Sequence, residues 1–142
     1  MALATWKVPL TALAIAGLLG GLAVGADVLL NEGPLAPAPR GPVPGVDATL
    51  SSTAQTYMEA AKRNDCGMTR ALTTSNTTAW CDGAKLISYT FLARTGDDGE
   101  CMAYRITTDR GLDGTDNGGT EPWSFCYRHT KVGWRLWDQG QG

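Results

Sequence analysis

The sequence is poor in the residues and motifs on which many enzyme sites depend. It has a single histidine, His129, and four cysteines, none of them before Cys66. It contains no GK[ST] phosphate-binding loop, no GxSxG nucleophile motif, no HExxH zinc motif and no CxxC pair. These absences argue against the hydrolase, metalloprotease and thiol-redox classes that the motifs mark. They also exclude a lipid-modified cysteine near the N-terminus.

The chain also lacks an excess of positive charge. Its 12 basic and 14 acidic residues give a net charge of -2. Proteins that bind nucleic acid neutralise phosphates with clustered lysine and arginine, and no basic stripe is present here. We therefore expect no nucleic-acid partner.

Metal-binding patterns are scarce as well. The loop at residues 109–120 carries Asp109, Asp113, Asp116 and Asn117. Their spacing departs from the calcium motif D-x-[DN]-x-[DN]-G, and no glutamate follows at the required distance. A lone histidine without a CxxC pair also argues against zinc. We expect neither a metal site nor a cofactor.

What the sequence does have is an apolar stretch at residues 8–30, with one charge, Asp27. As a helix it would be about 35 Å long at ~1.5 Å per residue, enough to cross a hydrocarbon core of ~30 Å. Lys7 precedes it and Glu32 follows it, so the positive-inside rule places residues 1–7 in the cytoplasm. We therefore expect a single-pass anchor in the lipid bilayer of the cell membrane, with the rest of the chain outside the cytoplasm.

A cleaved signal peptide is the alternative interpretation of this stretch. Residues 1–7 would be its charged region, residues 8–22 its apolar region, and Val24-Gly25-Ala26 a cleavage site. Apolar residues continue past that site at positions 28–30, which favours a retained anchor. Both interpretations export the remainder of the chain.

A proline-rich segment at residues 31–48 separates the apolar stretch from the folded part. Its prolines are Pro34, Pro37, Pro39, Pro42 and Pro44. Such a composition disfavours helices and paired strands, so we expect an extended, stiff spacer. The remaining residues, 49–142, are enough for one small domain.

The domain begins with a helical pattern. Its apolar stripe consists of Leu50, Ala54, Tyr57, Met58 and Ala61. This spacing predicts an amphipathic helix within residues 49–64, capped by a serine or threonine at positions 51–53 and ended by Asn64-Asp65. Residues 68–72 are expected to form a second short helix.

From Lys85 the apolar pattern has a period of two, which predicts strands. Four are expected, at residues 85–94, 100–108, 121–130 and 134–139. Their inward side would carry Ile87, Tyr89, Phe91, Ala93, Met102, Tyr104, Ile106, Trp123, Phe125, Tyr127, Trp134 and Leu136. Asp98-Gly99 predicts a two-residue hairpin turn, which would set Phe91 opposite Ile106.

The four cysteines all lie in the exported part, where an even count predicts two disulfides. Four cysteines allow three pairings, and the strand pattern favours one of them. Symmetric pairing of the second and third strands places Cys101 opposite Cys126, a geometry that suits a cross-strand bridge. Cys66 and Cys81 then remain to tie the helical part to the loop before the first strand.

Together these elements predict an α+β protein: an N-terminal transmembrane helix, then one or two helices packed on a curved antiparallel sheet of about four strands. The helix residues 57–61, the following Asn64-Asp65-Cys66 and the closing strand residues 133–138 resemble the NTF2-like (SnoaL-type) superfamily. The likeness is to its small exported or membrane-anchored bacterial members and covers residues 49–139. It implies a cone of the cystatin/NTF2-like kind.

The resemblance also implies candidate site residues. Enzymes of this superfamily use an aspartate or a histidine as general base inside the cone. Asp138 and His129 fall on the inward side by alternation, although the pattern places no second acid or base beside either. An apolar ligand pocket would be lined by Tyr57, Tyr89, Tyr104, Trp123, Phe125 and Trp134.

Fold alone does not decide function within this superfamily. We expect a membrane-anchored, non-catalytic domain that binds a protein partner or a small apolar ligand outside the cytoplasm. One alternative is a small isomerase- or dehydratase-type enzyme that uses Asp138, with or without His129. The other is a cleaved, secreted form of the same domain.

Overall fold

The protein is described here from a computed structural model, which describes residues 37–98, 100–112 and 117–141. The transmembrane helix expected at residues 8–30, its flank at residues 1–7 and the start of the proline-rich segment lie outside these described residues. Within them, no helix combines the length and the apolar character needed to cross a bilayer.

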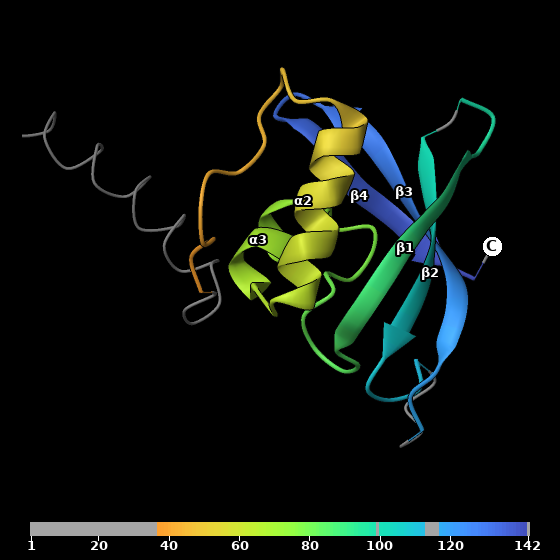
Figure 1. Ribbon diagram of the computed structural model, residues 1–142. Helices are drawn as coiled ribbons and strands as arrows, with labels where there is room; N and C mark the ends of the chain where they lie inside the picture. The colour runs from red at the N-terminus through yellow and green to blue at the C-terminus, as the bar shows by residue number, and fades with distance from the viewer. Residues whose placement is uncertain (1–36, 99, 113–116, 142) are drawn as a thin grey trace, which may run out of the picture. The chain divides into compact units, whose positions relative to one another are not determined.

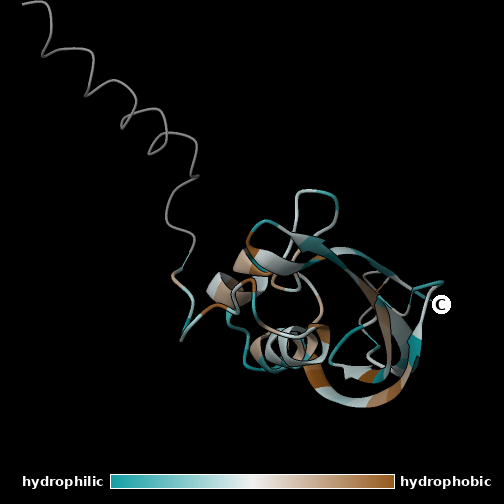
Figure 2. Ribbon diagram, turned by 90° about the horizontal axis from the view of Figure 1, so that it is seen from above, coloured by the Kyte–Doolittle hydropathy of each residue, from teal (hydrophilic) through white to brown (hydrophobic). Residues whose placement is uncertain are grey.

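The described part is an α+β domain with two helices followed by four strands. They are α2 (Leu50–Lys62), α3 (Cys66–Ala71), β1 (Leu86–Thr95), β2 (Cys101–Thr108), β3 (Thr120–Thr130) and β4 (Gly133–Gly140). The strands form one antiparallel sheet in the order β1-β2-β3-β4. Both helices lie on the same side of this sheet (Figure 1), and the strands curve (Figure 2). The expected helices and four-stranded antiparallel sheet are confirmed.

Helix α2 buries the stripe that its sequence predicts, but its cap differs from the prediction. The side chain of Thr49, not of a residue at positions 51–53, accepts a hydrogen bond from the Ser52 backbone N–H at 3.1 Å. Thr49 has extended backbone angles, as an N-cap requires, whereas Thr53 is already a buried residue inside the helix. Asn64, with φ of 52°, ends the helix where predicted.

The core fills the space between α2 and the inward face of the sheet. Its fully buried side chains include Tyr57, Met58, Leu72, Ile106, Phe125, Tyr127 and Leu136. The ring of Tyr57 packs 5.9 Å from that of Phe125 and 6.4 Å from that of Tyr127, both in tilted or edge contacts. Such pairs stabilise a core beyond their buried area.

The predicted register of β1 on β2 is wrong. The ladder ends at Thr95 opposite Cys101, so residues 96–100 connect the strands in place of a two-residue turn. Phe91 lies opposite Tyr104 rather than Ile106. A bulge at Leu92 accounts for the further shift, because an inserted residue moves every later pair.

A second irregularity in β1 overturns the expected inward position of Ile87. The register shifts between Leu86 and Ser88, so Ile87 stands outside the regular pairing and is 53% exposed. Leu86, opposite Thr108, is buried in its place. The alternation of side chains continues only on either side of such a bulge.

The structure contains two disulfides, Cys66–Cys81 and Cys101–Cys126, which are the pairs expected from the sequence. Cys101 lies directly opposite Cys126 on β2 and β3. The Tyr127 N–H donates to the Glu100 carbonyl at 3.0 Å, so the two cysteines occupy a non-hydrogen-bonded pair, in which facing side chains are closest.

The described end of the proline-rich segment packs on the domain instead of standing off as a spacer. The Arg40 N–H donates to the Asp65 carboxylate at 3.0 Å, and the Arg135 guanidinium donates to the Pro44 carbonyl at 3.2 Å. Asp65 and Arg135 are both buried, so these bonds are sheltered from water. The domain therefore includes residues from 37 onward.

Candidate functional site

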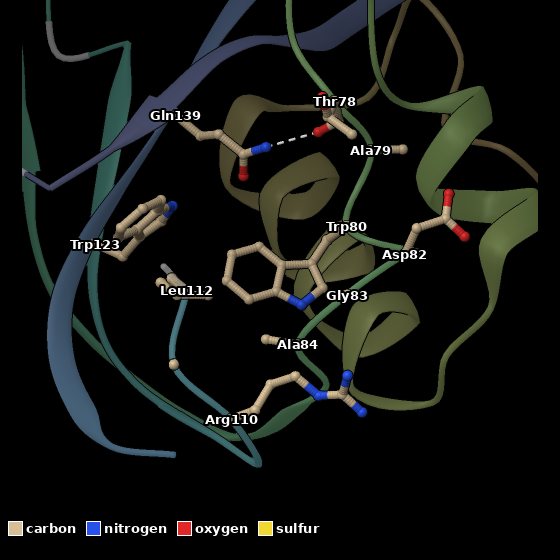
Figure 3. Close-up of a pocket in the computed structure, with 11 residues that line it drawn as sticks. Thr78, Ala79, Trp80, Asp82, Gly83, Ala84, Arg110, Leu112, Trp123 and Gln139 are labelled. Carbon is tan, nitrogen blue, oxygen red and sulfur yellow. Dashed lines mark hydrogen bonds between the residues drawn. The ribbon is translucent and has the colours of Figure 1, made fainter. Parts of the chain in front are cut away.

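A pocket of about 320 Å³ opens between the loop that precedes β1 and the ends of β2, β3 and β4. It is lined by Thr78, Ala79, Trp80, Asp82, Gly83, Ala84, Arg110, Gly111, Leu112, Trp123 and Gln139. Figure 3 shows the indole of Trp80 across the middle of this pocket, with Trp123, Leu112 and Gln139 on the side of the sheet. The volume lies at the small end of the range for ligand pockets, ~300–1,000 Å³.

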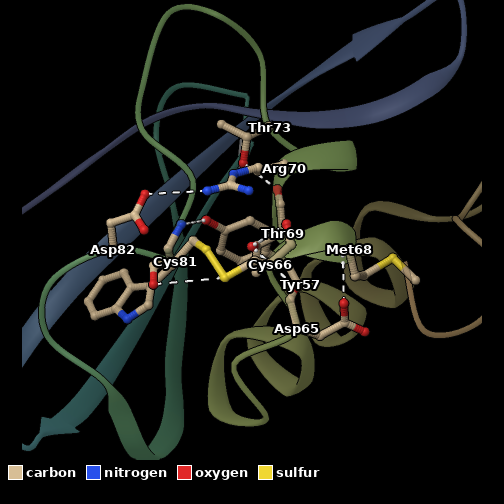
Figure 4. The surroundings of a disulfide bond; sticks show 10 residues. Tyr57, Asp65, Cys66, Met68, Thr69, Arg70, Thr73, Cys81 and Asp82 are labelled. Carbon is tan, nitrogen blue, oxygen red and sulfur yellow. Dashed lines mark hydrogen bonds and ion pairs between the residues drawn. A yellow bond between two sulfur atoms is a disulfide. The ribbon is translucent and has the colours of Figure 1, made fainter. Parts of the chain in front are cut away.

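Two contacts restrain the loop that carries Trp80 from the side of the helices. The Cys66–Cys81 disulfide joins the loop to α3, at the residue next to Trp80. The Trp80 backbone N–H donates to the Tyr57 hydroxyl at 2.8 Å, a buried bond to helix α2. Figure 4 shows this disulfide and the phenol of Tyr57 beside each other under the loop. The loop is thereby tied to both helices.

The opposite wall comes from the sheet. Trp123 lies on β3, and its ring meets that of Trp80 edge-on, with centroids 6.3 Å apart. Gln139 lies on β4 opposite Phe125, on the inward face. Its Nε2 donates to the Thr78 carbonyl at 2.6 Å and so bridges the strand to the loop.

A β-bulge at Trp137 decides which residue of β4 faces the pocket. The ladder pairs Tyr127 with Leu136 but Cys126 with Asp138, which leaves Trp137 unpaired between them. One inserted residue reverses the alternation beyond it. Asp138 therefore shares the outer face with the disulfide at Cys126, and Gln139 turns inward.

The predicted inward position of Asp138 is therefore wrong. Its side chain is exposed, does not line the pocket, and accepts a hydrogen bond from the Gln139 backbone N–H at 2.9 Å. His129 is exposed too, at the far end of the β3–β4 ladder, where its ring packs edge-on against Trp134 at 5.0 Å. The structure does not bring either candidate base to the pocket.

Only one residue of the predicted aromatic set, Trp123, lines the pocket. Tyr57, Tyr104 and Phe125 are buried in the core instead. Burial raises the pKa of Tyr57 and of Tyr104 to about 12.

The remaining members of the set make other contacts. Tyr89 donates to the Glu59 carboxylate at 2.6 Å, and Trp134 contacts His129. Desolvation, followed by this bond to Glu59, raises the pKa of Tyr89 to about 12. These phenols are hydrogen-bonding or packing groups rather than acids at neutral pH.

Three polar atoms of pocket-lining residues have no hydrogen-bond partner in the described part of the chain. They are Nε1 of Trp80, Nε1 of Trp123 and Oε1 of Gln139, and each is shielded from solvent by its neighbours. Buried polar groups in folded proteins are nearly always paired, so three unpaired ones around a single pocket mark it as unusual. Two are donors and one is an acceptor.

The charged residues of the pocket lie at its rim and face opposite charges. Asp82 meets Arg70 at 3.5 Å, and Arg110 meets Asp109 at 3.8 Å. These pairs are exposed and add little stability. Because each of these charges has an opposite partner, the four residues add no net charge around the opening.

A shallow groove adjoins the pocket on the other side of the same loop. It is lined by Arg70, Thr73, Thr74, Ser75, Thr77, Thr78, Ala79 and Asp82. Three of these residues also line the pocket. The groove is rich in hydroxyl groups, each of which both donates and accepts hydrogen bonds.

Sequence reasoning missed Trp80, Leu112 and Gln139 as site residues. Trp80 had a usable signal, since an aromatic residue beside a cysteine in a polar loop is held in place once the disulfide forms. Gln139 had none, because its direction depends on the bulge at Trp137. The described residues contain no group of three or more metal-binding side chains, and Asp113 and Asp116 lie outside them.

Comparison with known proteins gives no relative from which to infer a role. No family model matches the chain. No curated protein sequence and no solved structure shows a significant match either.

Proposed function

We propose that the chain is a membrane-anchored, extracytoplasmic binding domain of the NTF2-like type, without catalytic activity, whose ligand occupies the pocket between Trp80 and Trp123. Residues 8–30 serve as its anchor. The ligand is a small molecule with an apolar face. One observation carries the proposal: a loop tied to both helices and the sheet flank an open pocket, and three polar atoms of its lining residues are buried without partners among the described residues.

The rigidity of the pocket supports binding. A site that is already formed loses little conformational entropy when a ligand enters it. The disulfide Cys66–Cys81, the bond from Trp80 to Tyr57 and the bond from Gln139 to Thr78 all restrain its walls. The two disulfides are also typical of oxidising compartments, which supports a location outside the cytoplasm.

No observation favours the enzyme alternative. Asp138 and His129 are exposed and lie outside the pocket lining. The carboxylate that does line the pocket, Asp82, is exposed at its rim and paired with Arg70. A general acid or base has to reach the reacting atoms within hydrogen-bond distance, which an outward-facing Asp138 does not do for a ligand in this pocket.

The first test concerns location and covalent state. The full-length chain is recovered from isolated membranes, and its intact mass is measured without reduction. We expect an uncleaved chain in the membrane fraction, lighter by the four hydrogens lost in two disulfides. A mass that corresponds to a chain starting after Ala26 would support the secreted form. Recovery of the chain from the cytosol with four free thiols would overturn the proposal.

The second test concerns the pocket. The five tryptophans of the chain give separate indole N–H signals in nuclear magnetic resonance when only tryptophan carries ¹⁵N. Toluene, added to the full chain in lipid nanodiscs, is expected to shift the signals of Trp80 and Trp123 but not those of Trp134 and Trp137.

Two variants make the second test specific. Ala84→Phe places a ring in the pocket and should abolish the toluene shifts, whereas Ala93→Phe adds the same ring at an exposed position of β1 and should keep them. Shifts that persist in Ala84→Phe, or no shift in the unmodified chain, would contradict the assigned site.

A further inference from the structure

We infer that the pocket accepts a neutral carbohydrate ring, which packs its C–H face on Trp80 and places hydroxyl groups against Trp123 Nε1 and Gln139 Oε1. This inference rests on the proposed function and adds the chemical class of the ligand. It follows from three observations: the mixed apolar and polar lining of the pocket, a donor and an acceptor that lack partners, and the balanced charges at the rim.

The first observation is the mixed chemistry of the walls. Trp80, Leu112 and Trp123 supply apolar surface, and the indole of Trp80, a residue that is 9% exposed, forms a platform across the pocket (Figure 3). A pure hydrocarbon would fit this surface but would leave Trp123 Nε1 and Gln139 Oε1 buried and unpaired, at a cost for each. A sugar ring has both an apolar face and a rim of hydroxyl groups.

The second observation is a donor beside an acceptor. The Gln139 amide oxygen points toward the space between the two indoles, and Trp123 Nε1 lies on the part of its ring nearest that space (Figure 3). Trp123 Nε1 can only donate and Gln139 Oε1 can only accept. A hydroxyl group both donates and accepts, so sugar hydroxyls have the chemistry that both atoms require.

Gln139 also provides the route to these atoms, which neighbouring groups shield in the unliganded domain. It is only partly buried and lies next to the last residue of β4. Its single side-chain hydrogen bond, to the Thr78 carbonyl, closes this end of the pocket. The inference requires the amide to rotate when a ligand enters, so that ligand hydroxyls take over both the oxygen and the Thr78 carbonyl.

The third observation selects a neutral ligand. Asp82 and Arg110 at the rim already face Arg70 and Asp109. An acidic or basic ligand would have to compete with these pairs. The adjoining groove, with its five threonine and serine residues, offers hydroxyl groups for a second ring beyond the first.

The test uses the indole N–H signals of the full chain in lipid nanodiscs. The probes are methyl β-glucopyranoside, N-acetylglucosamine, maltose and cellobiose, with glucuronic acid as the charged comparison and toluene as the apolar one. We expect at least one neutral sugar to shift the Trp80 and Trp123 signals at lower concentration than glucuronic acid does. Trp134 and Trp137, which lie outside the pocket, serve as internal controls.

Gln139→Leu keeps the size of the side chain and removes its amide. We expect it to weaken sugar binding about tenfold more than toluene binding, because loss of the bond to Thr78 affects the pocket for both probes whereas only the sugar uses the amide. Trp134→Phe, outside the pocket lining, should leave both unchanged.

The outcomes separate the inference from the proposed function. If toluene shifts the Trp80 and Trp123 signals but no sugar does, the carbohydrate class is overturned and the proposed binding site is retained. Sugar binding that Gln139→Leu does not weaken would overturn the role of the amide pair. No shift with any probe would overturn both the inference and the proposed function.

Discussion

The hydroxyl of Tyr57 accepts a 2.8 Å hydrogen bond from the backbone N–H of Trp80. Tyr57 lies on the core face of α2, and Trp80 forms the platform of the pocket. Both residues are buried, so this bond from the Trp80 backbone to the Tyr57 side chain is shielded from water. The position of the pocket platform therefore depends directly on the packing of the helix.

The first prediction concerns this bond. Tyr57→Phe removes the acceptor and leaves the Trp80 N–H buried without a partner, so we expect the free energy of unfolding to fall by about 1–3 kcal/mol. Tyr127→Phe is the matched control, because the Tyr127 hydroxyl is buried and has no partner among the described residues. Its removal should be neutral or stabilising. Urea unfolding followed by fluorescence measures both, and an equal loss in the two variants would count against the role of the bond.

The second prediction separates the two disulfides. Removing either pair by double Cys→Ala substitution should cost about 3 kcal/mol, the value for loops of 15 and 25 residues. Only the loss of Cys66–Cys81 should raise hydrogen exchange in residues 78–84, since Cys101–Cys126 joins two strands away from that loop. Increased exchange of this loop in both double variants, under conditions where both stay folded, would refute the assignment.

The third prediction concerns alkaline pH. Burial raises the pKa of Tyr57 and Tyr104 to about 12 and that of Tyr127 well above 10. In the unfolded chain these phenols ionise near pH ~10. Below that pH both states keep the protons, and stability does not change on their account. As the pH rises from about 10 towards 12, the unfolded state releases protons that the folded state retains, so stability falls.

Tyrosinate absorbance and circular dichroism, recorded during one titration, check this prediction. The buried tyrosines should ionise together with unfolding, above pH ~10. Ionisation of all four tyrosines near pH ~10 in a domain that keeps its native circular dichroism would contradict it.

The fourth prediction concerns the segment that packs against α3. A methyl group added at Gly67 would meet backbone atoms of Pro37 and Ala38 well inside contact distance. Gly67→Ala should therefore displace this segment, lower the free energy of unfolding by about 1–3 kcal/mol and expose residues 37–44 to proteases. Gly45→Ala, where a methyl group meets nothing within 4 Å, is the control. Unchanged cleavage of Gly67→Ala would show that the segment is not held there.

Much of the fold could be predicted from local patterns. The stripe on α2 and the alternation in β2 each depend on one period, and both are regular in the structure. The pairing of Cys101 with Cys126 followed from a strand register without a bulge. Where side chains repeat without interruption, burial follows the sequence directly.

The errors in which strand residues face inward come from single inserted residues. Bulges at Ile87, Leu92 and Trp137 each shift a register, and nothing in the composition of these positions marks them. The bulge at Trp137 alone decides that Gln139 and not Asp138 faces inward. The pocket was missed because this bulge hid the inward position of Gln139. In addition, Trp80 lies in a loop whose sequence has neither the period of a helix nor that of a strand.

The bulges of β1 have a further consequence, for association between copies of the chain. The outer edge of β4 is covered at Leu136, in its middle, because Thr73 forms a parallel bridge with this residue and backbone bonds join Leu72 and Thr74 to it. β1 is the other edge of the sheet, and its regular spacing is broken at Ile87 and Leu92. An interrupted edge is a poor template for another strand. We therefore expect the sheet edges to pair poorly with another copy of the chain.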